Sequence, residues 1–136
     1  MFSLESKIEE LKKYFEDRPE VAMAFVFGSY AKKTSMTESD FDIAIYFQPK
    51  SQAIEWEEEL LEYDSEDKIW SDVEKIVGLR TDLLVLNRAP STVAYAVMQE
   101  GEQIIIKDKT LYWRFFLTIS MAAEDFREFA NDFWMI

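Results

Sequence analysis

Two short apolar runs, at 21–27 and 41–47, constrain the fold of this chain more than any other feature. The first run ends at a Gly28-Ser29 pair, and the second is interrupted near its start by Asp42. Runs of this length that are rich in β-branched and aromatic residues are typical of strands. The chain is therefore predicted to form a sheet that carries a glycine turn and acidic side chains, the parts that a metal-dependent phosphoryl-transfer site needs.

Two aspartates, Asp40 and Asp42, are candidate metal ligands. If both lie on the second strand, they point to the same face with their Cα atoms about 7 Å apart. Two carboxylates at that separation can converge on two divalent cations about 4 Å apart, and Mg²⁺ prefers oxygen ligands. Unpaired carboxylates are costly inside an apolar strand, so they need a cation or a water-filled cleft. In a chain with 27 acidic residues, an isolated Asp-x-Asp is more often a solvated turn.

The Gly28-Ser29 pair is a candidate phosphate-binding turn. Glycine has no Cβ, so its backbone can lie close to a phosphate. Ser29 is predicted to open a short helix through 30–33, whose free N–H groups attract an anion. Lys32 and Lys33 are candidates for steadying a triphosphate. The alternative is an ordinary turn with solvated lysines.

A third acidic residue, Asp82, stands near the start of another predicted strand at 82–86, just before the breaker segment 87–90. If this strand pairs beside the one at 41–47, all three carboxylates line one end of the sheet. The alternative is that Asp82 only caps the strand or forms an ion pair with Arg80.

Composition removes several kinds of chemistry. The sequence contains no histidine and no cysteine, which excludes Ser-His-Asp triads, thiolate nucleophiles and the usual zinc sites. The net charge of −12 argues against direct nucleic-acid binding, because affinity for phosphates depends largely on Lys and Arg. An acidic surface suits a basic protein partner, or it simply maintains solubility.

No segment of the sequence is predicted to reach a membrane. Charged residues occur within the first ten positions, which does not fit a signal peptide, and no apolar run approaches twenty residues. We therefore expect a cytoplasmic protein.

The remaining pattern predicts one α/β domain over 1–136. Further predicted elements are helices at 3–15 with Ser3 as N-cap, at 51–63 with a continuation toward 77, and at 91–99, and a strand at 103–107. Eight acidic residues between Glu55 and Asp67 are interpreted as a solvated helix face.

A long helix is predicted at 109–133. Its apolar stripe is spaced by three or four residues and consists of Leu111, Phe115, Ile119, Ala122, Phe126, Phe129 and Phe133. Packing on the sheet explains one stripe. The aromatic residues beside it suggest a second covered face, against a protein partner or another copy of this chain; they are Tyr112, Trp113, Phe116 and Trp134.

The motif as a whole resembles a known family. Gly28-Ser29, ten intervening residues, Asp40-x-Asp42 and a later Asp82 on a strand are similar to the polymerase-β-type nucleotidyltransferase superfamily. The chain length points to the minimal nucleotidyltransferases (MNT), the antitoxin half of HEPN/MNT toxin–antitoxin pairs. The resemblance covers about residues 20–107. It implies a small mixed β-sheet flanked by helices, with a long C-terminal helix.

The resemblance also implies roles for individual residues. Asp40, Asp42 and Asp82 would bind two Mg²⁺ ions, with Asp82 as ligand or as general base. Gly28 and Ser29 would hold the phosphates of ATP. The reaction would transfer AMP to a tyrosine hydroxyl of the HEPN toxin and so silence it. Two alternatives stay open: a small-molecule nucleotidyltransferase of the aminoglycoside-modifying type, and a non-catalytic antitoxin that neutralises its partner by binding.

Overall fold

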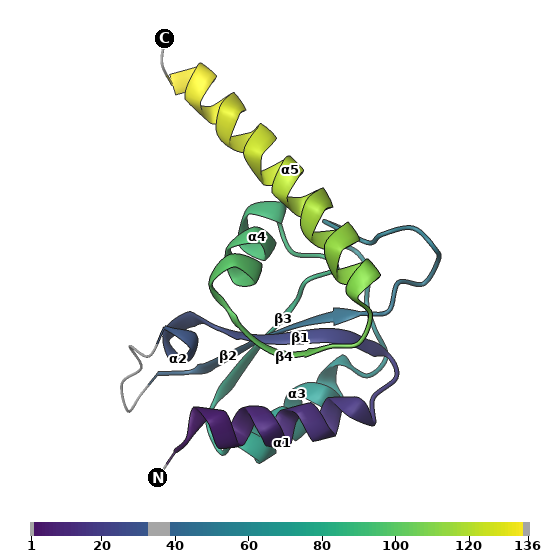
Figure 1. Ribbon diagram of the computed structural model, residues 1–136, viewed down its shortest axis with the longest axis vertical. Coiled ribbons are helices and arrows are strands. Elements are labelled where there is room, and N and C mark those ends of the chain that lie inside the picture. The colour runs from purple at the N-terminus through teal and green to yellow at the C-terminus, as the bar shows by residue number, and fades with distance from the viewer. Residues whose placement is uncertain (1, 33–38, 135–136) are drawn as a thin grey trace.

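The chain folds around a four-stranded mixed sheet with helices on both faces (Figure 1). The computed structural model describes residues 2–32 and 39–134. The elements are, in chain order, α1 (Leu4–Glu16), β1 (Val21–Phe27), α2 (Gly28–Ala31), β2 (Phe41–Phe47), α3 (Glu66–Val77), β3 (Thr81–Val85), α4 (Ser91–Glu100), β4 (Glu102–Ile106) and α5 (Lys109–Trp134). The predicted α/β class with a long C-terminal helix is confirmed.

The strand order in the sheet is β3-β2-β1-β4. Strand β1 runs antiparallel to both β2 and β4, whereas β2 and β3 are parallel. A parallel pair needs a crossover, and the segment 48–80, which contains α3, provides it. The expected pairing of the strand that carries Asp82 with the strand at 41–47 is confirmed.

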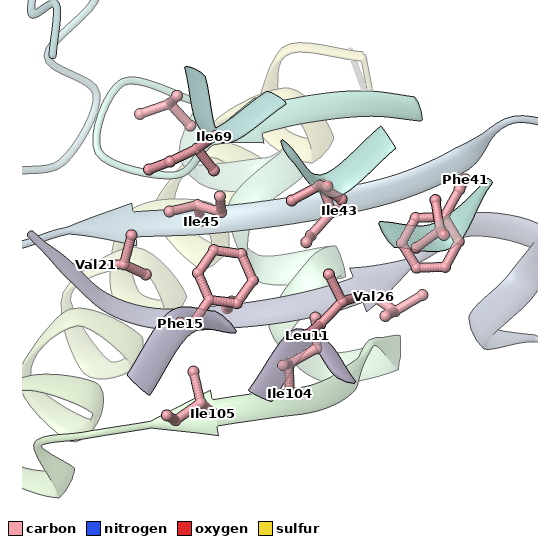
Figure 2. Close-up of a cluster of buried hydrophobic side chains, with 14 of the residues drawn as sticks. Leu11, Phe15, Val21, Val26, Phe41, Ile43, Ile45, Ile69, Ile104 and Ile105 are labelled. Carbon is pink, nitrogen blue, oxygen red and sulfur yellow. The ribbon is translucent and has the colours of Figure 1, made fainter. Parts of the chain in front are cut away.

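The sheet separates two hydrophobic clusters because alternate strand residues point to opposite faces. One cluster lies beneath α1 and α3 and includes Leu11, Phe15, Ile43 and Ile69 (Figure 2). Fully burying an apolar side chain of this size contributes about 1.5–3 kcal/mol.

The cluster on the other face lies under α4 and α5 and includes Tyr46, Leu86 and Phe115. Ala44 and Tyr46 of β2 belong to this cluster. Because every second residue of a strand points to the same face, Asp42 also lies on the face of α4 and α5. The acidic site therefore opens on that side of the sheet.

Most element boundaries follow the sequence pattern. Strands β1 and β2 occupy the predicted ranges, and α1 begins after Ser3, whose Oγ accepts a hydrogen bond from the Ser6 N–H at 3.4 Å. Strands β3 and β4 each begin one residue earlier than predicted. Apolar periodicity predicts that an element exists more accurately than it predicts the residue at which the element begins or ends.

The predicted helix at 51–63 is wrong, because this segment is a loop and α3 starts only at Glu66. Glu55 is 7% exposed and anchors the loop. Its carboxylate accepts hydrogen bonds from the Lys50 N–H at 2.8 Å, from Asn87 Nδ2 at 3.0 Å and from the Tyr63 hydroxyl. These bonds, one of which comes from Asn87 at a sequence separation of 32 residues, outweigh the local helix propensity. The interpretation of the acidic run as a solvated face is therefore wrong for Glu55.

Helix α5 packs on the body through an apolar face, and further along the helix the Arg127 guanidinium lies over the Tyr95 ring of α4, 5.9 Å from its centre. Leu111, Phe115 and Ile119 are buried, and Ala123 rather than Ala122 completes this face. Phe126 continues the same stripe, yet it is 60% exposed. The far end of the helix extends beyond α4 (Figure 1). Phe129, Phe133 and Trp134 lie outside the described side chains. Within the described residues, no helix is both long and apolar enough to cross a membrane.

Candidate active site

Two aspartates and the glycine turn meet at one end of the sheet. Asp42 pairs in register with Asp82 across the parallel strands β2 and β3. On its other side, Asp42 pairs with Phe27, the residue before Gly28. The strand starts are held together by a bond from the Phe41 N–H to the carbonyl of Arg80 at 2.8 Å. The topology therefore brings the three separate parts of the motif into one row.

Gly28 lies directly against Asp42. A Cβ atom at position 28 would stand only 2.2 Å from Asp42 Oδ2, and the φ angle of Gly28 is +72°. Both the close approach and the left-handed backbone require glycine. The glycine turn is consequently packed directly against this carboxylate.

Asp40 lies one residue before β2, so the expectation that both aspartates are strand residues is wrong for Asp40. Its charge nevertheless acts on Asp42. Burial, followed by the charges of Asp82 and then Asp40, raises the pKa of Asp42 above its ordinary value. Three carboxylates that repel one another favour a bound cation, since it relieves the repulsion.

The donor atoms at this end of the sheet fit a magnesium ion. Asp40, Asp42 and Asp82 offer carboxylate oxygens, which are the ligands that Mg²⁺ prefers. In the described part of the chain, no three acidic side chains are already arranged as a cation site. The roles of these residues as ligands stay predictions.

Helix α2 begins at Gly28, one residue before Ser29, which was predicted to open it, and it ends at Ala31, before the two lysines that the prediction included. Ser29 is half-buried, and Lys32 follows the last helical residue. The ammonium of Lys32 forms an exposed ion pair with Glu100 of α4 at 3.2 Å. Lys33 lies outside the described residues.

A groove between α2 and α4 adjoins the glycine turn. It has a volume of about 350 Å³ and is lined by Phe27, Gly28, Lys32, Thr92, Val93, Ala96, Val97 and Glu100. We call it the α2–α4 groove. The helix at 91–99 was predicted from the sequence, but its contribution to a groove was not, because no sequence motif marks the residues that line the groove. The only available signal was the apolar character of exposed helix positions.

Helix α3 holds the outer edge of β3 beside Asp82. The Trp70 indole N–H donates to the carbonyl of Thr81 at 2.7 Å, and the Thr81 N–H donates to the Glu74 carboxylate at 3.1 Å. Among the described residues, the ion pairs do not join Arg80 to Asp82. The carboxylate of Asp82 is therefore left exposed at the end of the sheet.

This sheet, with its glycine turn against paired aspartates, has the architecture of a nucleotidyltransferase, and solved structures share its fold. A toxin-antitoxin structure with AMP-PNP is 20% identical with a TM-score of 0.69, covering 98% of this chain and 100% of that chain. A structure of a tri-AMPylated Shewanella oneidensis HEPN toxin in complex with MNT antitoxin is 17% identical with a TM-score of 0.67, and the match covers 97% of this chain and 98% of that chain. A structure of the toxin-antitoxin MntA-HepT is 15% identical with a TM-score of 0.66, and the match covers 97% of this chain and 99% of that chain. At such low identity, the likeness shows the fold alone.

The family itself is shown by sequence. The family model for polymerase beta, nucleotidyltransferase, matches residues 9–110, well over half of the chain, and the chain belongs to this family. No curated protein matches the chain in sequence.

Proposed function

We propose that this chain transfers AMP from ATP to a tyrosine hydroxyl of a HEPN-type toxin and thereby acts as its antitoxin. The observation that carries the proposal is the register of Asp42 with Asp82, beside a glycine turn that fits only against Asp42. Family membership supports nucleotidyl transfer. The similar structures that contain AMP-PNP and a tri-AMPylated toxin support the donor and the acceptor.

In the proposed mechanism, the N–H groups of Gly28 and Ser29 bind the phosphates of ATP, and Lys32 adds positive charge nearby. Asp40, Asp42 and Asp82 would hold two Mg²⁺ ions, which would neutralise the negative charge that develops during the transfer.

The acceptor reacts on the side of Asp82. This residue is exposed on the edge strand β3, where a protein side chain can approach. The tyrosine oxygen forms a bond to the α-phosphorus, and the bond from that phosphorus to the bridging oxygen breaks. Asp82 accepts the hydroxyl proton, and pyrophosphate leaves toward the glycine turn.

The surface of α5 is the proposed docking site for the toxin. Trp113, Leu117, Met121 and Phe126 are all more than half exposed on one helix, which is an unusual concentration of apolar surface. The net charge of −12 favours a basic partner. A second copy of the chain is the competing occupant.

The test uses the purified chain with Mg²⁺, ATP labelled on the α-phosphate, and extract from its source cells. We expect label on one discrete protein, lost with Asp40→Asn and kept with Asp67→Asn, which removes an exposed charge from α3 away from the site. Label only on small molecules would instead indicate an antibiotic-modifying type of enzyme. ATP binding without any labelled product would indicate an antitoxin that acts by binding alone.

A further inference from the structure

We infer that Tyr30 is a positioning residue that fixes the distance between the glycine turn and the acidic start of β2. The inference rests on the proposed function, because that function needs one Mg·ATP to be held by both parts at once. Helix α2 spans only Gly28–Ala31, and a helix of one turn is not stable by itself. Its position therefore depends on contacts with the rest of the fold.

Tyr30 provides the buried contact of α2. It is the buried residue of this helix and is 9% exposed, whereas Ser29 and Ala31 are half-buried. Its ring packs on that of Phe41, the first residue of β2, with the ring centres 5.7 Å apart, and on that of Phe2 at 5.2 Å. Aromatic pairs at such distances add stability beyond the burial of surface. The ring thus attaches α2 to the start of β2.

The Tyr30 ring and the glycine turn contact opposite faces of β2. Phe41 belongs to the cluster beneath α1 and α3, while the next residue, Asp42, lies on the face of α4 and α5. Gly28 packs against Asp42, and Tyr30, two residues later, packs against Phe41. The short helix therefore holds the start of β2 from both sides, so a shift of the helix moves the turn relative to the carboxylates.

The hydroxyl group of Tyr30 adds a contact beside Asp40. It donates a hydrogen bond of 3.4 Å to the carbonyl of Ser39, the residue before Asp40. This distance is longer than the usual range for a bond between a hydroxyl and an oxygen, so we assign the larger part of the positioning to the ring. Removal of the hydroxyl alone should consequently have a small effect.

The spacing between the two parts matters because one ligand has to contact both. In the proposed site, the turn binds the phosphates of ATP and the carboxylates bind the cation that these phosphates carry. A displacement of about 1 Å in such an arrangement can cost about a hundredfold in rate. Loss of the Tyr30 ring should therefore weaken the binding of Mg·ATP, while the carboxylates stay able to bind a cation alone.

The experiment measures the binding of two probes without any acceptor, Mg·ATP by titration calorimetry and Mn²⁺ alone by electron paramagnetic resonance. For Tyr30→Leu we expect at least about tenfold weaker binding of Mg·ATP and unchanged binding of Mn²⁺. Tyr30→Phe keeps the ring and should bind Mg·ATP within about twofold of the wild type. Phe2→Ala removes the ring that packs on Tyr30 and should weaken Mg·ATP binding at least about threefold. If Tyr30→Leu does not fold, Phe2→Ala takes its place in each comparison.

Phe15→Leu is the matched control. Phe15 is fully buried in the same hydrophobic cluster as Tyr30, and it lies far along the sheet from Phe41 (Figure 2). This variant should lower the melting temperature, as Tyr30→Leu does, but it should bind both probes like the wild type.

The outcomes separate this inference from the proposed function. If Tyr30→Leu binds Mg·ATP like the wild type, Tyr30 does not position the turn, and the proposed function stands. If Tyr30→Leu loses Mn²⁺ as strongly as Mg·ATP, or if Phe15→Leu loses Mg·ATP to the same extent, the effect is a general loss of structure and the inference is wrong. If the wild type does not bind Mg·ATP, the proposed function and the inference fail together.

Discussion

Asp42 is closely surrounded by other groups of the site. Gly28 packs against its carboxylate, and Asp82 and Asp40 place two further negative charges nearby. Burial and these charges raise the pKa of Asp42. At neutral pH and without a cation, the ionised form of Asp42 is therefore less favourable in the folded chain than in the unfolded chain, which lowers the stability of the fold. Such a cost is typical of residues that serve a functional site.

The first prediction is that Asp42→Asn abolishes nucleotidyl transfer and raises the melting temperature by a few degrees at pH 7 without Mg²⁺. The amide has nearly the same shape as the carboxylate and removes its half-buried charge. Since the folded pKa of Asp42 is raised, the wild type regains this stability as the pH falls through that pKa, and the gap between the two proteins closes. Thermal unfolding at several pH values measures the effect. A lower melting temperature than that of Asp67→Asn, which loses an exposed charge, would contradict it.

Helix α3 contacts both the start of β3, beside the site, and its neighbour α1 in the same helix layer. On one side, Trp70 and Glu74 bond to the backbone of Thr81, next to Asp82. On the other side, Asp72 accepts hydrogen bonds from the Tyr14 hydroxyl at 2.6 Å and from Arg18 at 3.2 Å, both from the α1 region. Loss of the contacts with β3 should affect the site, whereas loss of the contacts with α1 should affect only the stability of the fold.

The second prediction concerns the contact with β3. Trp70→Phe removes the indole N–H and leaves the Thr81 carbonyl without that donor, which is expected to cost about 1 kcal/mol of stability. The start of β3 then holds Asp82 less firmly, so transfer should need more Mg²⁺ for half-maximal rate. A magnesium titration of the transfer rate measures this change. Trp56→Phe is the control, because Trp56 lies in the 48–65 loop, whose neighbouring residues bond to Asn87 beyond the other end of β3. An equal shift in both variants would refute the positioning role.

The third prediction concerns the contact with α1. The hydrogen bond from Tyr14, together with Lys68 and Arg18, lowers the pKa of Asp72 below its ordinary value of 3.8. A lowered folded pKa contributes stability above the unfolded pKa, and this stability is lost as the pH falls through the folded pKa. Asp72→Asn should therefore unfold at a lower temperature than the wild type at pH 7, with a difference that shrinks below about pH 4. A constant difference across the pH series would show that the charge is irrelevant.

The sequence predicted the elements whose evidence is local. Strands β1 and β2 are continuous apolar runs, and Ser3 is a standard N-cap, so their positions follow from neighbouring residues. The 48–65 loop was not predictable in this way, because Glu55 is held by Asn87, a partner far along the chain. The α2–α4 groove is likewise formed by two elements that only the fold brings together.

The candidate site was predictable in part for the same reason. Gly28, Asp40 and Asp42 lie close together in the sequence, and Asp82 could be added only by assuming that its strand pairs with β2. The parallel register confirms that assumption. The contact between Gly28 and Asp42, by contrast, depends on antiparallel pairing of β1 with β2, which the sequence pattern does not specify.

For the whole molecule, the shape is a body with one projecting helix (Figure 1). The fourth prediction is that the double variant Met121→Ser and Phe126→Ser unfolds at the wild-type temperature, because these side chains are 68% and 60% exposed. It should bind Mg·ATP normally but bind the labelled partner protein at least about tenfold more weakly, since interface anchors are usually worth 1–2 kcal/mol or more. Pull-down and calorimetry with that partner measure the loss. Unchanged partner binding together with a change in the oligomeric state would assign this surface to a second copy of the chain.

The parallel pairing of β2 with β3 also has a consequence for the timing of folding. Asp42 and Asp82 become neighbours only after the crossover 48–80 is complete, and contacts between distant parts of a chain form slowly. A ribosome that has made β2 still needs seconds to make β3, at about 5–20 residues per second. A nascent or truncated chain can therefore carry the glycine turn and two aspartates and still lack a complete site, so that activity begins only when the topology of the whole sheet is in place.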